Sequence, residues 1–344
     1  MFKKLSVLIL ALLMLSLTAC GQKLSPESVP EVADDGQTVS NSAAKILNPL
    51  TGVSGISKEA AESRPVAIMV NNMKTAQSVQ TGLTDADIIY ETEVEGGITR
   101  LMAVFQDVSG VSLVGTVRSA RYPYIDLAGG HNAVYVHEGQ DPTYAKAHLN
   151  DIDDISLENA KLGKRISNGL AKEHTLYTEG SVLWDGIKSK FKTENTNASS
   201  WADFAAEDEE VTLPSGSAQS VSVPFSTSYN TGFTYDPSTK TYTRLSGGSV
   251  WHEYKTGKSL AVKNVFVLLT TISDYPDGKH RKVALDSGDG YYITNGTYTF
   301  IKWSKGSAKK GFIFTDTEGN PIKVSAGNSY VCIADKVTSN PTIQ

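Results

Sequence analysis

Residues 98–108 read ITRLMAVFQDV, an apolar run with the length and side chains of a buried β-strand. Two similar runs lie on either side of it along the chain, RPVAIMV at 64–70 and AVYVH at 133–137. Each run is short, and each is bounded by polar or turn-forming residues, so these segments indicate strands rather than long helices.

Helix signals lie between and after these runs. Thr84 and Asp87 have the spacing of a capping box, in which a side chain satisfies the free amides at a helix start. Thr178 is placed to cap a helix over residues 181–191. Strands that alternate irregularly with short helices predict a mixed α/β domain over residues 48–193.

The last third of the chain has a different pattern. Residues 194–220 are acidic and then rich in Ser, which predicts a linker. Beyond the linker, turn residues at 236–240 precede β-rich runs such as NVFVLLTTI at 264–272, and DSGDG at 286–290 indicates another turn. We therefore expect a smaller antiparallel β-rich domain over residues 221–338, which makes the whole chain α+β.

The first twenty residues contain a membrane-targeting signal. Lys3 and Lys4 precede an apolar run over residues 5–19, too short to cross a bilayer as a helix but typical of a secretion signal. The run closes on Leu-Thr-Ala before Cys20, which resembles the lipobox of bacterial lipoproteins. In a lipobox the cysteine thiol carries a diacylglycerol, and two or three acyl chains hold a protein stably on a membrane.

This resemblance implies a signal peptide over residues 1–19, a lipid on Cys20 and a flexible tether over residues 20–47. The cell membrane is then a partner of the chain through the lipid, and the rest of the protein lies on the extracytoplasmic face. The alternative is a plain secretion signal in which Cys20 is incidental.

Composition excludes several classes of protein. The 344 residues carry a net charge of −5, so no basic excess exists to neutralise a nucleic-acid backbone. Two cysteines cannot form a disulfide framework, and Cys332 lies in an apolar run where we expect a buried, inert thiol. The chain also lacks the spacings of common metal, nucleotide and serine-hydrolase motifs, so we expect no metal and no cofactor.

An acidic stretch precedes a pair of glycines. Glu91 and Glu95 are close together in YETEVEGGITR at 90–100, which ends in Arg100. Paired carboxylates can divide acid and base work when their surroundings separate their pKa values, so Glu91 and Glu95 are catalytic candidates. The alternative is a solvated acidic segment that Arg100 partly neutralises.

A basic stretch follows at 115–124, GTVRSARYPY. Arg118 and Arg121 flank Ser119, and two guanidiniums with a hydroxyl between them suit the binding of carboxylate or phosphate. The alternative, an internal ion pair with the glutamates, is compatible with a ligand-binding cleft.

Histidine is the remaining candidate acid or base. His137 ends an apolar run, and residues at strand ends often face active sites in α/β proteins, so His137 could assist as a base. His174 lies in KEHTLY at 172–177. A structural, hydrogen-bonded histidine is the alternative for both residues.

Taken in order, these stretches resemble the YerB-like lipoprotein family of Gram-positive bacteria, a family of unknown function. The resemblance rests on EGGITR and VRSAR above all, and more loosely on the C-terminal region. It implies a mixed α/β domain followed by a smaller β-rich domain. The family pattern falls on thirteen residues, namely Glu91, Glu95, Gly96, Gly97, Thr99, Arg100, Arg118, Ser119, Arg121, His137, Gly139, His174 and Tyr177.

The resemblance thereby adds Arg100, His174 and Tyr177 to the ligand-binding candidates Arg118, Ser119 and Arg121. The chain departs from the family pattern at two places. Gln140 and Asp141 replace the end of a Gly-Gly-Ser run, and Glu173 and Thr175 flank His174 where the family tends to have Pro and Asn.

Three hypotheses of function follow. The first is an envelope lipoprotein that binds an anionic or glycan ligand, such as peptidoglycan, or an envelope protein partner. The second is a hydrolase or lyase of peptidoglycan or another wall polymer, with Glu95 or Glu91 as acid or base and His137 assisting. The third is a structural scaffold of an envelope complex. The sequence leaves open whether the protein is an enzyme.

Overall fold

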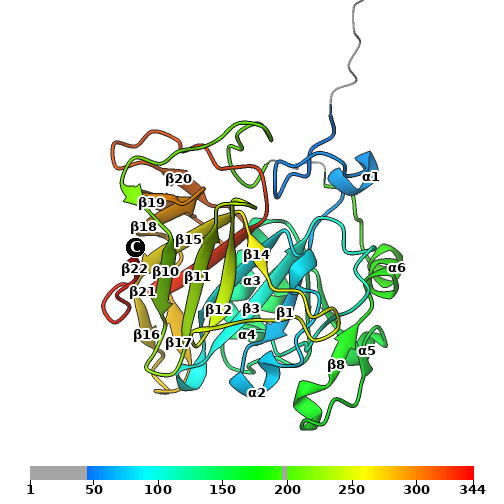
Figure 1. Cartoon of the computed structure of the whole chain (residues 1–344). Helices are drawn as coiled ribbons and strands as arrows, with labels where there is room; N and C mark the ends of the chain where they lie inside the picture. Colours follow the sequence, from blue (N-terminus) through cyan, green and yellow to red (C-terminus); the bar gives the residue numbers. More distant parts are fainter. Residues whose placement is uncertain (1–44, 196–199) are drawn as a thin grey trace, which may run out of the picture. The chain divides into compact units, whose positions relative to one another are not determined.

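A mixed sheet of eleven strands takes segments from both expected domains (Figure 1). The structure is a computed structural model that describes residues 45–195 and 200–344. The predicted signal peptide and Cys20 lie outside the described residues. Across the main sheet the strands are β20 (Ile313–Thr315), β19 (Thr297–Ser304), β18 (Ser287–Thr294), β15 (Asn264–Thr270), β21 (Ser329–Asp335), β2 (Ile88–Glu93), β3 (Thr99–Phe105), β1 (Val66–Asn71), β5 (Val134–His137) and β6 (Asp154–Ser156), and β9 (Gly216–Ser217) pairs with β19.

Of the seven neighbouring strands from β15 to β6 in the main sheet, six run in the same direction. β1, β5 and β6 pair in parallel, as do β2, β21 and β15, while β3 pairs antiparallel with both β1 and β2. The six strands therefore end along one side of the sheet, which we call the carboxyl edge. They begin along the opposite side, the amino edge.

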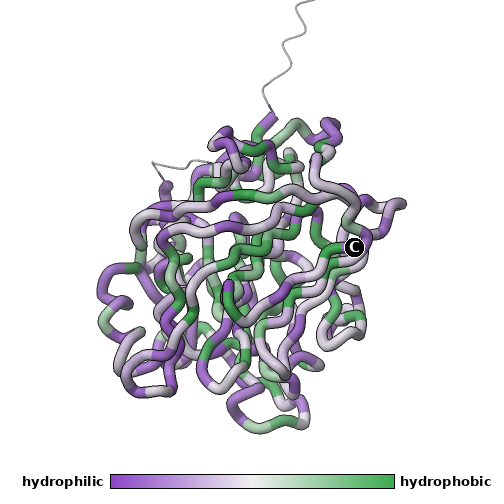
Figure 2. Tube along the Cα trace, turned by 90° about the vertical axis from the view of Figure 1, so that its left-hand side faces the viewer, coloured by the Kyte–Doolittle hydropathy of each residue, from purple (hydrophilic) through white to green (hydrophobic). Residues whose placement is uncertain are grey.

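The strands at the centre of the main sheet are buried on both faces. Val66, Ile68 and Val70 of β1 point into one hydrophobic core, and Ala67 and Met69 point into another. This explains the unbroken apolar runs in the sequence, because a strand covered on both sides shows no alternation. Figure 2 shows the apolar segments of the chain gathered in the interior.

A second sheet of six strands covers one face of the main sheet. All its pairings are antiparallel, and β10 alternates buried and half-buried residues, as expected for a strand with one face on a core. Its strands are β13 (Ser249–Val250), β12 (Thr241–Ser246), β11 (Asn230–Asp236), β10 (Ser220–Pro224) and β22 (Thr342–Ile343), with β14 (Ala261–Val262) paired to β12. The predicted fold class, a mixed α/β region followed by an antiparallel β region, is confirmed.

Short helices and small sheets complete the structure. α3 packs on the second core, and no helix among the described residues is both long and apolar enough to cross a bilayer. The helices are α1 (Lys58–Ala61), α2 (Lys74–Gln77), α3 (Tyr122–Gly130), α4 (Ala145–His148), α5 (Leu157–Ala160) and α6 (Gly180–Lys190), with short 3₁₀ turns η1 (Leu83–Asp85), η2 (Glu95–Gly97), η3 (Leu149–Asp151) and η4 (Lys172–His174). The small sheets are β4 (Val114–Gly115), β8 (Leu176–Thr178) and β7 (Lys164–Arg165), and the hairpin β16 (Ile272–Asp274) and β17 (Arg281–Val283).

Three local predictions are wrong. Thr84 lies inside the 3₁₀ turn η1, which Gly82 precedes without a side-chain cap. Thr178 does not cap α6, because its hydroxyl donates to the carbonyl of Leu162. Residues 287–290 form the start of β18 rather than a turn, because they pair with β15 on one side and β19 on the other. Cys332 is fully buried in β21 as expected, and burial raises the pKa of its thiol.

Candidate functional site

The basic stretch of the sequence crosses the carboxyl edge of the main sheet. After β4 the chain runs beside the end of β1, where the amide of Asn71 donates to the carbonyl of Thr116 (2.9 Å). It then passes the end of β5, where the amide of Ala120 donates to the carbonyl of Gly139 (2.9 Å). Ligands of open α/β sheets bind at this edge, so the backbone path alone brings Arg118 and Arg121 to a favourable place.

Two arginines hold Glu95 from different segments. Arg121 Nε donates to Glu95 Oε2 (2.8 Å), and its terminal nitrogen Nη2 donates to Oε1. Arg100 Nη2 lies 3.5 Å from Glu95 Oε1, and its other terminal nitrogen donates to the carbonyl of Ser119. Burial alone would raise the pKa of Glu95, but the hydrogen bonds and charge of Arg121, with the charge of Arg100, outweigh it and hold that pKa at about 2.

The glycines after Glu95 make this arrangement possible. Gly96 and Gly97 have φ angles of +73° and +66°, in the left-handed region that side chains disfavour. The turn ends β2 and places Glu95 beyond the strand, facing the start of β3. Glu91 and Glu95 therefore do not share a face, although they are only four residues apart.

Arg118 is the least satisfied of the three arginines. Its Nε is buried and has no hydrogen-bond partner among the described residues. Its terminal nitrogens lie 3.4 Å from the carbonyl oxygen of Glu173 and 3.9 Å from the Glu173 carboxylate. The side chain is 22% exposed, which leaves part of the guanidinium open to solvent.

We call Arg100, Arg118 and Arg121, with Glu95 and Glu173, the arginine cluster. Three positive charges face two carboxylates, and Glu173 is itself half exposed. Burial, together with the neighbouring charge of Arg121, lowers the pKa of Arg100 to about 10. The cluster therefore carries an excess of positive charge in a partly buried place, which attracts an anion more strongly than an exposed arginine would.

One side of the arginine cluster is closed by the hairpin β16–β17. Tyr275 of the hairpin stacks on Tyr144 with ring centroids 3.7 Å apart, and Arg281 pairs with Glu93 (2.9 Å). Only about 10 Å³ remains between the hairpin and the Glu95–Arg121 pair, room for about one water. Arg118 does not line this space and is the most exposed of the three arginines, so we call it the open end of the cluster.

Glu91 belongs to a separate network between the two sheets. Its carboxylate is 1% exposed and accepts hydrogen bonds from the side chains of Asn72, Thr99, Thr231 and Tyr330 (2.6–3.0 Å). These contacts use both carboxylate oxygens and leave no path to solvent. Glu91 is therefore placed to join the sheets rather than to meet a ligand.

Arg244 completes this inter-sheet network. It is fully buried and donates from Nε to the hydroxyl of Tyr330 (3.1 Å), while both terminal nitrogens have no partner among the described residues. The guanidinium also lies over the ring of Trp251, 5.9 Å from its centroid. Its charge needs the nearby carboxylate of Glu91 as a counter-charge.

The two histidines have different surroundings. His137 is buried, with Nδ1 2.8 Å from the carbonyl of Gly139 and Nε2 3.0 Å from Asp154, so neither ring nitrogen is free to take a proton from a ligand. His174 Nδ1 lies 2.7 Å from the side-chain nitrogen Nδ2 of Asn71. Its Nε2 lies 3.6 Å from the carboxylate of Glu173, which belongs to the arginine cluster.

Tyr177 and Ser119 have structural contacts. The buried Tyr177 hydroxyl donates to the carbonyl of Val79 (3.0 Å) and accepts from Asn168 (2.9 Å). Ser119 is half-buried and its carbonyl holds Arg100. The structure thus brings together six of the nine candidates and places Glu91, His137 and Tyr177 elsewhere. The six are Arg100, Arg118, Ser119, Arg121, Glu95 and His174.

Sequence reasoning did not select Glu173 or Asn71. Glu173 is the carboxylate nearest Arg118, and Asn71 holds the ring of His174. Only their positions in the sequence could have pointed to them, since Glu173 precedes His174 and Asn71 ends the strand β1. Among residues 45–195 and 200–344, no three His, Cys, Asp or Glu side chains gather in a way that could hold a metal ion.

Comparison with known proteins shows the family of the chain. Two adjacent family models match it, the N-terminal domain of a protein of unknown function (DUF3048) over residues 50–196 and the corresponding C-terminal domain over residues 221–331. The chain belongs to this YerB-like family.

Two Bacillus subtilis comparisons agree with this assignment. The chain is 29% identical over 325 residues to the "Putative lipoprotein YerB" of strain 168, covering 89% of this chain and 88% of that one. It is also similar to the crystal structure of YerB protein from Bacillus subtilis, with a TM-score of 0.74 and 26% identity over 87% of this chain and all of that one. All five residues of the arginine cluster lie in the segment that matches the N-terminal domain of the YerB-like family.

Proposed function

We propose that the protein is a lipoprotein of the extracytoplasmic face that binds an anionic ligand of the cell envelope at the arginine cluster. The ligand is a carboxylate or phosphate group carried by a wall polymer. Arg118 makes the first contact, Arg121 and Arg100 supply the positive field, and Glu95 fixes the orientation of both.

The state of Arg118 carries this proposal. A guanidinium has five N–H donors, and a buried donor without an acceptor costs about 1–3 kcal/mol. Arg118 has a buried, unpartnered Nε and only long contacts to Glu173, although its neighbours are well bonded. An anionic group at the open end of the arginine cluster would supply the missing acceptor and balance the excess charge.

The geometry favours binding over cleavage of a wall polymer. A general acid must hold its proton near neutral pH, whereas two arginines hold the pKa of Glu95 at about 2. Glu91 is enclosed between the sheets, and both ring nitrogens of His137 are engaged. Glu95 is therefore suited to orienting the arginines, and Glu91 and His137 to joining parts of the fold, rather than to cleaving a polymer.

The membrane anchor rests on the lipobox-like segment before Cys20 and on the printed name of the Bacillus subtilis relative. Fractionation of cells that express Cys20→Ala tests it. The variant should leave the membrane fraction, because a thiol is needed to carry the diacylglycerol. A variant that stays in the membrane fraction would show that another feature anchors the chain.

Retention on purified Gram-positive cell walls tests the binding itself. The native chain should sediment with the walls, and Arg118→Gln should lower the retained fraction at least tenfold. Lys323→Gln is the matched control, since Lys323 is an exposed cation paired with Asp203 (2.7 Å) far from the arginine cluster in the sequence. Unchanged retention of Arg118→Gln, or no retention of the native chain, would contradict the proposal.

A further inference from the structure

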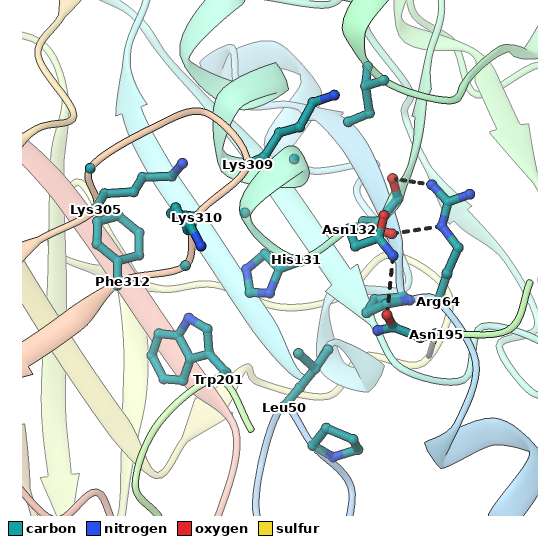
Figure 3. Close-up of a pocket in the computed structure, with 18 of the residues that line it drawn as sticks. Leu50, Arg64, His131, Asn132, Asn195, Trp201, Lys305, Lys309, Lys310 and Phe312 are labelled. Carbon is teal, nitrogen blue, oxygen red and sulfur yellow. Dashed lines mark hydrogen bonds between the residues drawn. The ribbon is translucent and has the colours of Figure 1, made fainter. Parts of the chain in front are cut away.

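A large cavity opens at the amino edge of the main sheet, the edge opposite the arginine cluster. Its volume is about 1370 Å³, and it lies where β1, β5 and β6 begin (Figure 3). The segment between β19 and β20, residues 305–312, forms another part of its wall. We call this space the amino-edge cavity.

Lysines form one wall of the amino-edge cavity. Lys305, Lys309 and Lys310 lie within one short loop, and none has a carboxylate within 4.0 Å among the described residues. Lys305 is only 4% exposed, and its ammonium donates to two loop carbonyls, those of Ser307 (2.9 Å) and Ala308 (3.0 Å). Burial lowers the pKa of Lys305 to about 8, because nearby Asp126 compensates its charge only in part.

The lysine loop is held in place by its contact with α3. A Cβ atom on Gly130 would come within 2.7 Å of the carbonyl of Lys310, and one on Gly129 within 2.9 Å of the carbonyl of Ala308. The two glycines at the end of α3 therefore allow backbone to pack directly against backbone. This contact presents the lysines toward the amino-edge cavity as a fixed wall.

Amide side chains form the facing wall. The side-chain amide of Asn132 donates to the side chain of Asn195 (3.1 Å). Arg64 holds this wall in place, because it donates to the backbone carbonyl of Asn132 (2.8 Å) and to the Asp153 carboxylate (2.5 Å). Figure 3 shows Arg64, Asn132 and Asn195 on the opposite side of His131 from Lys305 and Lys310. Amides can both donate and accept, which suits neutral hydroxyl groups.

Between the two walls lies a neutral floor. Trp201 and Phe312 contribute aromatic surface, and His131 and Trp201 both bond to the hydroxyl of Tyr90 (2.8 and 3.1 Å). Burial, with the charge of Lys305, lowers the pKa of His131 to about 3, so the imidazole is uncharged at neutral pH. The cavity thus combines unpaired positive charge, amides and a neutral aromatic surface.

We propose that the amino-edge cavity binds an acidic oligosaccharide. The carboxylates of the sugar would face the lysine wall, its hydroxyls the amide wall and its apolar ring faces the floor. Cavities for a single small ligand span about 300–1000 Å³, so this volume suits a short chain of rings.

The acidic residues at the rim favour a sugar over a simpler polyanion. Asp151 and Asp286 also line the amino-edge cavity, and an ionised carboxylate can only accept hydrogen bonds. Sugar hydroxyls can donate to them, whereas a ligand made only of anionic groups would be repelled. The proposal is independent of the arginine cluster, since none of the five residues of that cluster lines the cavity.

Isothermal titration calorimetry on the full-length chain in mild detergent tests the proposal. The ligands are a tetrasaccharide of uronic acids, a neutral tetrasaccharide of hexoses and tetraglutamate, each up to about 1 mM. The uronic tetrasaccharide should bind at least tenfold more tightly than either of the other two. The double variant Lys309→Gln/Lys310→Gln should weaken it at least tenfold, and both lysines are exposed, so the fold is retained.

Two variants serve as controls. Lys302→Gln removes an exposed lysine on β19 that does not line the cavity and should leave binding unchanged. Arg118→Gln should also bind the tetrasaccharide normally, which separates this site from the arginine cluster. Absence of binding, equal binding of the neutral sugar or of tetraglutamate, or normal binding by the double lysine variant would each overturn the proposal.

Discussion

At the scale of single residues, Glu95 shows how two arginines from different segments fix one carboxylate. Arg121 and Arg100 reach it from separate segments and form a rigid corner, so Arg118 is left at the open end. The same contacts make the charge on Glu95 a source of stability. Because the pKa of Glu95 is lower in the folded chain, its contribution to the unfolding free energy decreases as the pH falls.

Glu95→Gln should lose this pH-dependent stabilisation. At pH 6, well above the ordinary pKa of 4.5, the carboxylate is ionised in both the folded and unfolded chains, so its contribution is complete. As the pH falls toward 2, the unfolded chain takes up the proton first and the contribution is lost. The difference in unfolding free energy between native and Glu95→Gln chains should shrink by about 2 kcal/mol between pH 6 and pH 3.

Urea unfolding at the two pH values measures this difference. Glu318→Gln, which alters an exposed turn, is the control and should show no comparable change with pH. A pH-independent difference for Glu95→Gln would mean that the arginines do not hold Glu95 as described.

Glu91→Gln should destabilise the protein by about 3 kcal/mol, because it leaves the buried charge of Arg244 without its counter-charge. Retention on cell walls at a temperature where the variant is folded should stay near the native level, since Glu91 lies away from the arginine cluster. Urea unfolding and sedimentation with walls measure the two effects. A stable variant with lost retention would instead place Glu91 in the ligand site.

The sequence predicts the residue types of the arginine cluster but not their partners. The motifs EGGITR and VRSAR already indicate acids facing arginines. Alternation along a strand would put Glu91 and Glu95 together, yet the left-handed turn at Gly96 and Gly97 separates them. Glu173 reaches Arg118 only through the tertiary fold, which no local pattern encodes.

At the scale of elements, α6 depends on a close backbone contact. A Cβ atom on Gly180 would meet the carbonyl oxygens of Val108 and Val111 at 1.9 and 2.6 Å. We expect Gly180→Ala to lower the unfolding free energy by roughly 3 kcal/mol, since backbone atoms cannot move aside cheaply. Gly110 lies between Val108 and Val111 with open space around it, so Gly110→Ala should change the unfolding free energy by at most about 1 kcal/mol.

Urea unfolding of the two variants compares them directly. Equal stability of Gly180→Ala and Gly110→Ala would contradict the packing of α6. The sequence does predict a helix over this region, but it assigns the start to Thr178 because a hydroxyl before a helix is the usual cap. The structure uses the small size of Gly180 there instead.

At the scale of the whole molecule, β2 and β21 join the segments that match the two family domains. They pair in parallel from Ile88 opposite Ser329 to Thr92 opposite Ile333. Apolar runs predict both strands, but nothing in either run identifies a partner more than 200 residues away. The expected boundaries at 48–193 and 221–338 thus come from local patterns, whereas the sheet itself is continuous.

This shared sheet predicts a single unfolding transition. Circular dichroism and tryptophan fluorescence should give coincident urea curves, because neither segment can lose its strands without exposing the other. Val331→Ala, at the buried junction, should lower both midpoints equally, with a loss of about 2 kcal/mol. Two separate transitions, or a shift in only one signal, would show that the segments unfold independently.

Nuclear magnetic resonance of the arginine Nε–H groups can test whether an anionic ligand binds at the arginine cluster. The full-length chain, labelled with ¹⁵N-arginine in detergent micelles, would be titrated with inorganic phosphate and then with soluble wall-polymer fragments. Arg118→Gln identifies the signal of Arg118 by its loss. We expect a saturable shift of the Arg118 signal, while the signal of buried Arg244 stays unchanged. An unmoved Arg118 signal, or equal shifts at both residues, would contradict binding of an anionic ligand at the arginine cluster.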